Sequence, residues 1–597
     1  MALFSGETAV IRLRTFVLVL VYAALSVGYF LQNASYGYTG VDDVFVLAGS
    51  WRLFNGQIPY KDALFIRPPI PYFLHSLWFF LPDGWQVLST RLFFYIEMAL
   101  SGFLPMLWAV RTNRVHCFTR FLALGIIFFA FAIHSTPAQA WHQIDAIFLA
   151  SAALTSFLFS LTAKTGSARL GFRISSSLLF CIAAFCKQGF GIFPLMLLTF
   201  AGWEKFQLKE DGKKRHGTTL FWCSIVPCFL VAVSIVGCLA WMDGLRAFLH
   251  QMSILTIKPL IDSGVRAYLY SPLQIFALAG FVIVFIRYRP TAAPPGNPSF
   301  FSKLDLAFFL IVYILVIQAN RILIFFPAYA LFWLAIGGLL GKSFLSFYLR
   351  QPFPLISWCV YVGILSIAWA ASISLGYPTP VHGFAALAVL FDDLLPVPFK
   401  IKWKNNLASI IIAGLILLSF SLHNYRHYNG GPNRNVPLVN LADVFPRLGP
   451  IFTPTEYYEA QKELKQLCVG HAISKGKSFF AIPNDPLIYF LLNQVNTLLL
   501  DSAWEIEFLG NEKRFYDQII SKKPILVVEK FPMRPLNRPA NLLPHCKDLS
   551  DSYRSIEHRH IGNLKAQSFE LVTNLVKDWQ LIAEGKYFCV FRHPTDF

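Results

Sequence analysis

Charged residues are scarce in this chain. Only 14% of its 597 residues are charged, whereas 55% are hydrophobic and 16% are aromatic. Soluble domains carry about 25% charged residues, and the mean hydropathy of this chain is +0.52. The composition therefore excludes a large soluble enzyme and indicates a protein that crosses a membrane many times.

Cysteine is also scarce, and the ten cysteines form no CxxC pair and no Cys/His cluster with zinc-site spacing. A disulfide scaffold is therefore excluded. Most of the cysteines lie in apolar stretches, where they are expected as small buried hydrophobes: Cys181, Cys186, Cys223, Cys228, Cys238 and Cys359. Cys468, Cys546 and Cys589 lie near the C-terminus, where an oxidising compartment would allow one disulfide that the sequence does not identify.

Positive charge is what the chain does have, with a formal net charge of +18. In a soluble protein this excess would suggest nucleic acid as a partner. Here the basic residues fall mostly in short links between apolar runs, and the strongest cluster is EKFQLKEDGKKRHG at residues 204–217. Such links orient helices with their basic ends in the cytoplasm. We therefore expect membrane lipids around the protein and no nucleic acid.

A membrane helix needs roughly 20 apolar residues. The first run, 16–31, follows Arg12 and Arg14 as in a signal peptide, but GYFLQNAS is a poor cleavage site, so an uncleaved helix with a cytoplasmic N-terminus is favoured. The later runs are 88–110, 121–133, 146–161, 174–186, 190–201, 220–241, 273–286, 306–317, 322–340, 356–374, 384–395 and 410–422. We predict about thirteen crossings in a helical membrane domain, residues 1–422, of the inner (cytoplasmic) membrane.

Residues 423–597 have a different pattern. TPTEYYEAQKELKQL is an amphipathic helix with a Thr-x-x-Glu start of the capping-box kind. KSFFAI and PILVVE read as buried strands, and LIAEGKYFCVF reads as a hairpin that turns at Glu584 and Gly585. Helix and strand signals alternate, so we expect a small extracytoplasmic α/β domain.

The first outer loop, residues 33–87, carries the strongest chemical signal. Asp42 and Asp43 stand side by side, and the apolar residues that follow are spaced as in a helix that lies along the interface. As an N-cap and first-turn pair, the two carboxylates would complement the helix dipole. Paired acids beside a lipid boundary also suit a functional site, and the sequence leaves both interpretations open.

A second segment of this loop, NGQIPYKDALFIRPPIPYF at residues 55–73, completes a motif. It resembles the first-loop pattern of the GT-C glycosyltransferases, integral membrane enzymes that use polyprenyl-phosphate sugars and include the aminoarabinose transferases and protein mannosyltransferases. The resemblance is carried by Asp42, Asp43, Gly56, Tyr60, Arg67, Pro68, Pro69 and Tyr72. In one departure, relatives of the aminoarabinose type carry an acid before the basic-Pro-Pro unit, where this chain has Ile66 and its nearest acid is Asp62.

The resemblance implies an inverting hexosyl- or pentosyltransferase of the cell envelope that moves a sugar from a polyprenyl-phosphate donor to a hydroxyl of a glycan, lipid or protein. Asp42 is the expected general base, and Asp43 orients it, holds a divalent cation or caps the helix. Arg67 is the expected phosphate ligand, because a guanidinium group matches phosphate oxygens. Lys187 and Arg321, at the outer ends of later runs, are further phosphate ligands or interfacial anchors.

Other residues of the outer turns are weaker candidates. Tyr60, Asp62, Tyr72 and His142 are expected to bind substrate; His134 and Asp145 flank the same turn as His142, which is otherwise a plain polar loop. A flippase or transporter of lipid-linked glycans is the main rival hypothesis. Transporters place ionisable residues inside the spans, which here are almost without acids apart from Glu97. An inactive structural homologue is the second rival.

Overall fold

The computed structural model describes most of the chain. The described residues are 6–38, 44–133, 138–210, 214–256, 274–288, 325–350, 354–372, 383, 385–394, 411, 413–414, 437–482, 485–501, 511–530, 546 and 574–595. The predicted site residues Asp42, Asp43, His134 and Arg321 lie outside this set, as does the predicted domain boundary at residue 422.

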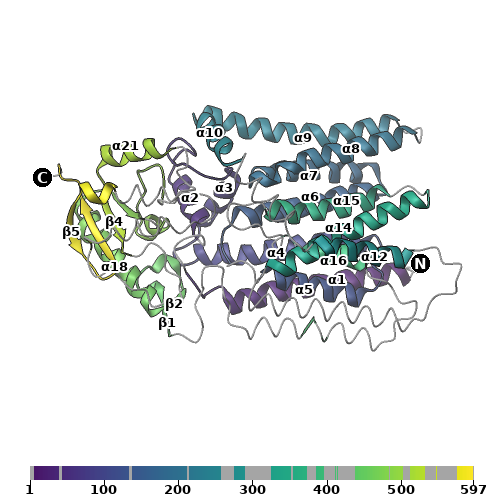
Figure 1. The fold of residues 1–597 in the computed structure, drawn as a ribbon, viewed down its shortest axis with the longest axis horizontal. Helices are drawn as coiled ribbons and strands as arrows, with labels where there is room; N and C mark the ends of the chain where they lie inside the picture. Colours follow the sequence, from purple (N-terminus) through teal and green to yellow (C-terminus); the bar gives the residue numbers. More distant parts are fainter. Residues whose placement is uncertain are drawn as a thin grey trace.

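A bundle of long, roughly parallel helices makes up most of the described structure (Figure 1). Its helices are α1 (Gly6–Asn33), α4 (Gln86–Arg111), α5 (Phe118–Ile133), α6 (His142–Thr162), α7 (Gly166–Ala184), α8 (Ile192–Glu210), α9 (Lys214–Trp241), α12 (Ile275–Tyr288), α14 (Phe325–Tyr348), α15 (Leu355–Ser372) and α16 (Leu387–Leu394). Among the described residues, six helices are long and apolar enough to cross a membrane: Thr8–Asn33, Gln86–Arg111, His142–Thr162, Arg215–Trp241, Tyr329–Tyr348 and Leu355–Ser372. The predicted polytopic helical fold is confirmed, and the number of crossings stays a prediction.

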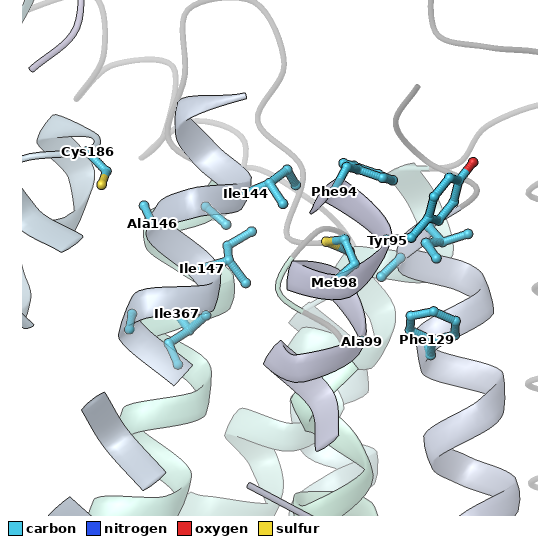
Figure 2. Close-up of a cluster of buried hydrophobic side chains, with 14 of the residues drawn as sticks. Phe94, Tyr95, Met98, Ala99, Phe129, Ile144, Ala146, Ile147, Cys186 and Ile367 are labelled. Atoms are coloured by element: carbon cyan, nitrogen blue, oxygen red, sulfur yellow. The ribbon is translucent and has the colours of Figure 1, made fainter. Parts of the chain in front are cut away.

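Apolar side chains fill the centre of the bundle. Figure 2 shows Phe94 and Met98 of α4 beside Ile144 and Ile147 of α6, with Phe129 of α5 on the other side. Each of these five side chains is at most 1% exposed. Between helices that cross a membrane, close van der Waals packing of such side chains holds the helices together. The core therefore fixes α6 against α4, and with it the N-terminal end of α6, where His142 lies.

The predicted run at residues 384–395 is described only in part. Its described helix, α16, has eight residues, and the crossing itself stays a prediction. At its end Asp392 pairs with Arg120 of α5 at 3.1 Å, and Asp393 accepts a hydrogen bond from Tyr361 at 3.0 Å. These buried ionic contacts hold the end of α16 among the neighbouring helices.

A layer of short helices separates the bundle from the C-terminal region (Figure 1). It contains α2 (Phe45–Phe54), α3 (Ile70–Ser76), η1 (Leu77–Phe80), η2 (Gln188–Gly191) and α10 (Leu245–Thr256). The helix α2 was predicted to lie along the interface, yet every residue from Val46 to Arg52 is buried. Gly49 permits this burial, because a Cβ there would lie 2.7 Å from the ring of Tyr72 on α3.

The C-terminal region contains the predicted α/β elements. Its helices are α18 (Thr455–His471), α19 (Ile488–Leu491) and α21 (Glu512–Lys522), with 3-10 turns η5 (Leu441–Asp443), η6 (Pro446–Leu448) and η7 (Ile473–Lys475). One sheet pairs β1 (Leu438–Asn440) with β2 (Phe452–Pro454); the other has the order β3 (Phe479–Ile482), β4 (Ile525–Glu529), β6 (Phe588–Arg592), β5 (Gln580–Glu584). β3 and β4 are parallel and the other pairs antiparallel. The predicted capping box is wrong, because Pro454 is the N-cap of α18 and no side chain caps it.

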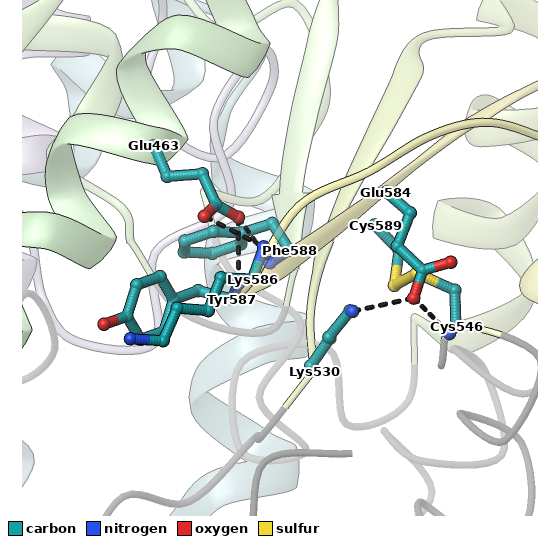
Figure 3. Close-up of a disulfide and its surroundings, with 8 residues drawn as sticks. All are labelled: Glu463, Lys530, Cys546, Glu584, Lys586, Tyr587, Phe588 and Cys589. Atoms are coloured by element: carbon teal, nitrogen blue, oxygen red, sulfur yellow. Dashed lines mark hydrogen bonds and ion pairs between the residues drawn. A yellow bond between two sulfur atoms is a disulfide. The ribbon is translucent and has the colours of Figure 1, made fainter. Parts of the chain in front are cut away.

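A disulfide joins Cys546 to Cys589 of β6, which identifies the pair that the sequence left open (Figure 3). Beside it, Glu584 accepts hydrogen bonds from Lys530 Nζ at 2.8 Å and from the Cys546 amide at 3.1 Å. The third cysteine of the region, Cys468, is buried and reduced.

Candidate functional site

Arg67 is held where the first outer loop turns into α3. Its backbone carbonyl accepts a hydrogen bond from the Tyr60 hydroxyl at 2.6 Å, and Arg67 Nη1 donates to Gln188 Oε1 at 3.3 Å. Gln188 in turn donates to the carbonyl of Ile66 at 3.1 Å. The following Pro68 favours an extended backbone at Arg67. The local sequence thus fixes this guanidinium group against η2.

Lys187 immediately precedes η2 and is 1% exposed. Its ammonium group donates to Gln143 Oε1 at 3.1 Å and to the carbonyl of Ala371 at 2.8 Å. Burial holds the pKa of Lys187 well below its usual range, and the nearby charge of Arg67 lowers it further. Burial likewise lowers the pKa of Arg67. Two cations therefore share one buried environment.

His142 and Tyr72 complete this arrangement, which we call the cation cluster: Arg67, Lys187, His142, Tyr72, Gln143 and Gln188. The charges of Arg67 and Lys187 both act on His142, and Tyr72 interacts electrostatically with Arg67. In the part of the chain that the structure describes, neither Arg67 nor Lys187 has a carboxylate partner. Buried charges are normally paired, so the cluster has the character of an anion site.

The structure brings four predicted residues together in this cluster, and Tyr60 contacts it through Arg67. Asp62 is placed differently. Its carboxylate accepts the backbone N–H of Ile58 at 2.8 Å and closes the loop 58–62. Its charge acts on Lys522 of the C-terminal α21. Asp62 therefore has a structural role in the described contacts, while its predicted role in substrate binding stays a prediction.

The helix that follows Asp42 and Asp43 begins later than the capping interpretation requires. Val44 is the N-cap of α2, no side chain caps it, and the first turn contains no acid. The two aspartates precede the cap and are not its first-turn acids. A metal ion held by them stays a prediction; within the described residues, no group of three or more His, Cys, Asp or Glu side chains is arranged to hold a metal.

A buried polar network one turn deeper in α6 is more extensive than the sequence indicated. His75 of α3 contacts Asp145 at 3.1 Å, and the charge of Asp145 acts on the buried carboxyl group of Glu97. Glu97 is thus not an isolated acid within a span.

The C-terminal region is fixed to the first outer loop by the guanidinium group of Arg52. Arg52 is 2% exposed and pairs with Asp501 at 3.2 Å. It also donates to the carbonyls of Leu498, Leu499 and Asp62, and to Gln57. The backbone N–H of Leu64 donates to the carbonyl of Leu499 at 2.8 Å. The loop that carries Tyr60 and Arg67 is therefore held between the bundle and the C-terminal region.

No protein-family model and no curated protein matches the chain. The crystal structure of ArnT from Cupriavidus metallidurans bound to undecaprenyl phosphate is similar, with 13% identity and a TM-score of 0.45 over 97% of this chain and 98% of that chain. The oligosaccharyltransferase AglB from Archaeoglobus fulgidus, in complex with an inhibitory peptide and a dolichol-phosphate, has 12% identity and a TM-score of 0.42 over 98% and 74%. Both are GT-C glycosyltransferases, the class that the first-loop motif resembles.

Proposed function

We propose that this protein is an integral membrane glycosyltransferase that moves a sugar from a polyprenyl-phosphate donor to an acceptor hydroxyl. The observation that carries the proposal is the burial of Arg67 and Lys187 in one environment, with no carboxylate partner among the described residues. A lipid phosphate supplies the missing negative charge. Arg321, which lies outside the described residues, is the third proposed phosphate ligand.

The chemistry needs a base at the acceptor and positive charge at the leaving group. Asp42 takes the proton of the acceptor hydroxyl, and the oxygen attacks the anomeric carbon from the face opposite the phosphate. The bond between that carbon and the phosphate oxygen breaks, and the electron pair leaves with the polyprenyl phosphate. One displacement inverts the anomeric configuration. Arg67 and Lys187 stabilise the negative charge that develops on the departing phosphate.

The proposed reaction takes place on the extracytoplasmic face. The Cys546–Cys589 disulfide supports this orientation, because disulfides persist in oxidising compartments. The region with the disulfide contacts the same loop that carries Arg67. At the opposite end of α4 lie Arg111 and Arg114, where the positive-inside rule expects cytoplasm.

The rival transport hypothesis rests on ionisable groups inside the spans, and Glu97, Asp145, Arg173 and Glu204 are such groups. However, Arg173 pairs with Glu204 through a close contact, and Asp145 is bonded to His75. Arg173 and Glu204 therefore neutralise each other and Asp145 is held by a histidine, whereas Arg67 and Lys187 have no anionic partner in the described structure. Catalysis at the outer end of the bundle therefore accounts for the described charges better than transport through it.

A transfer assay in proteoliposomes tests the proposal. The purified protein is supplied with undecaprenyl-phosphate sugars, and mass spectrometry follows the sugar to the acceptor lipids or glycans. Asp42→Asn is expected to abolish transfer while undecaprenyl phosphate still binds. Asp43→Asn is the matched control for the choice of base. An Asp42→Asn protein that transfers sugar like wild type would refute the assignment. Surface glycans of a deletion strain identify the acceptor.

A further inference from the structure

Three polar groups of the site region are buried without a hydrogen-bond partner. They are both amide atoms of Gln139, the Nδ1 atom of His142 and the Nε atom of Arg67. The three side chains are 2%, 6% and 5% exposed. Leaving a buried polar group without a hydrogen-bond partner destabilises the folded protein. Such a cost at three adjoining positions calls for an explanation.

The three groups belong to one place in the fold. Gln139 lies in the short segment that leads into α6, three residues before His142. Ala140, between them, packs in a buried cluster with Tyr60 and Tyr72. The charge of Arg67 acts on His142. Gln139 therefore lies on the border between the aromatic residues of the first loop and the cation cluster.

Neighbouring amides show that Gln139 is an exception. Gln143 accepts a hydrogen bond from Lys187, and Gln188 both accepts one from Arg67 and donates one to the carbonyl of Ile66. These two glutamines hold cations in place. Gln139, in the same region, makes no such bond to the protein. A methionine of similar size would avoid the cost of its burial.

We propose that Gln139 and His142 bind hydroxyl groups of the sugar that the lipid donor carries. This inference rests on the proposed function and extends it to the sugar. An amide has two donor hydrogens and an acceptor oxygen, and a neutral imidazole has one of each, so both match hydroxyl groups, which donate and accept. Neither adds a charge beside the phosphate. The substrate class is accordingly a polyprenyl phosphate that carries a neutral sugar.

Gln139→Met tests this inference, because it removes the amide with little change in volume. The probes are undecaprenyl phosphate alone and undecaprenyl phosphate that carries glucose, galactose, mannose or arabinose, with binding measured in nanodiscs. We expect the variant to bind the bare lipid like wild type and to lose about 10- to 100-fold in affinity for the sugar-bearing donor. Its thermal midpoint should equal or exceed that of wild type, because no protein hydrogen bond is lost.

Gln143→Met is the matched control. This variant removes the hydrogen bond to Lys187, so it should weaken the binding of bare undecaprenyl phosphate and of the sugar-bearing lipid by the same factor. If Gln139→Met loses affinity for both lipids equally, or has a thermal midpoint several degrees below that of wild type, Gln139 is structural and the inference is wrong. It is also wrong if wild type binds none of the four sugar lipids more tightly than the bare lipid. If wild type does not bind undecaprenyl phosphate at all, the proposed function itself has failed.

Discussion

The imidazole of His75 and the carboxylate of Asp145 lie 3.1 Å apart, and both side chains are almost completely buried. His75 Nδ1 accepts a hydrogen bond from Trp78 Nε1 at 3.0 Å, so the proton of the neutral ring is on Nε2 and faces Asp145. The charge of Asp145 also acts on Glu97 of α4. This chain of contacts joins the first outer loop to α6 and α4, next to His142.

His75→Leu is therefore expected to destabilise the protein by about 1–3 kcal/mol, because it leaves Asp145 without its donor in a buried place. Thermal unfolding in detergent micelles measures the effect. Trp78→Phe removes only the bond to Nδ1 and should cost less. A His75→Leu protein with the thermal midpoint of wild type would mean that the contact does not support the loop.

Arg67→Met is expected to weaken the binding of undecaprenyl phosphate by about 100-fold, since a charge-assisted hydrogen bond contributes about 1.5–3 kcal/mol. Arg67→Lys should restore only part of the affinity, because an ammonium group lacks the planar fork of a guanidinium group. Native mass spectrometry or titration in nanodiscs provides the measurement. Equal affinity of wild type and Arg67→Met would remove Arg67 from the phosphate site.

The buried amine of Lys187 predicts a specific dependence on pH. Its pKa lies well below the usual value, so the ammonium form is lost as pH rises through this lowered pKa. Phosphate binding needs the charged form, and affinity should fall with rising pH by up to about tenfold per unit. Titrations above pH 7, where a phosphate monoester is already dianionic, isolate the effect.

Stability should change in the opposite direction. Between the lowered pKa of Lys187 and the ordinary value, the unfolded chain binds more protons than the native state, so unfolding becomes less favourable as pH rises. Lys187→Met removes the contribution of this amine to the pH dependence of lipid affinity and to the pH dependence of stability. If the pH dependence of binding persists in the variant, another group is responsible for it.

Removal of the guanidinium group in Arg52→Met is expected to cost about 3–5 kcal/mol, because it leaves Asp501 as an unpaired buried charge and several carbonyls without donors. Limited proteolysis should cut the C-terminal region faster, and lipid binding at Arg67 should weaken with it. Asp501→Asn keeps the carbonyl contacts of Arg52 and serves as the milder control. Unchanged proteolysis of Arg52→Met would show that the two regions do not depend on this contact.

Replacement of Cys546 by alanine removes a disulfide that closes a loop of 43 residues. The loss of this constraint on the unfolded chain is expected to cost about 4 kcal/mol. Gel mobility after maleimide labelling, with and without reductant, shows whether the bond exists in cells. Labelling of both Cys546 and Cys589 without reductant would contradict the extracytoplasmic placement. Cys468→Ala, in the same region but outside the bond, is the control.

Local signals account for the parts that sequence predicted well. A turn signal at Glu584 and Gly585 between two apolar stretches predicts a hairpin, and the structure pairs β5 with β6 there. The Arg67-Pro68 unit likewise combines a cation with a backbone restriction in adjacent residues. Such features depend on residues that are close together in the sequence, so they can be predicted before the fold is known.

Long-range contacts explain the rest. Arg52 looks like an ordinary basic residue near a helix C-terminus, where it would face water. Three of its partners, Leu498, Leu499 and Asp501, lie more than 440 residues away along the chain. Gln139 carries no sequence signal, because its burial and its missing partners exist only once α6 meets the first loop. The partners of Asp392 and Asp393 in α16 likewise come from other helices, so the sequence of this run does not reveal them.

The distance along the chain between Arg52 and Asp501 also has a consequence for biosynthesis. The two residues are 449 positions apart, and a ribosome that adds about 5–20 residues per second needs roughly 20–90 s to cover that stretch. During this time the first outer loop lacks the acceptors that hold Arg52. The loop that carries Arg67 is completed only when the C-terminal region has been translated. A nascent or truncated chain therefore exposes an unfinished loop, which offers proteases a means to recognise it.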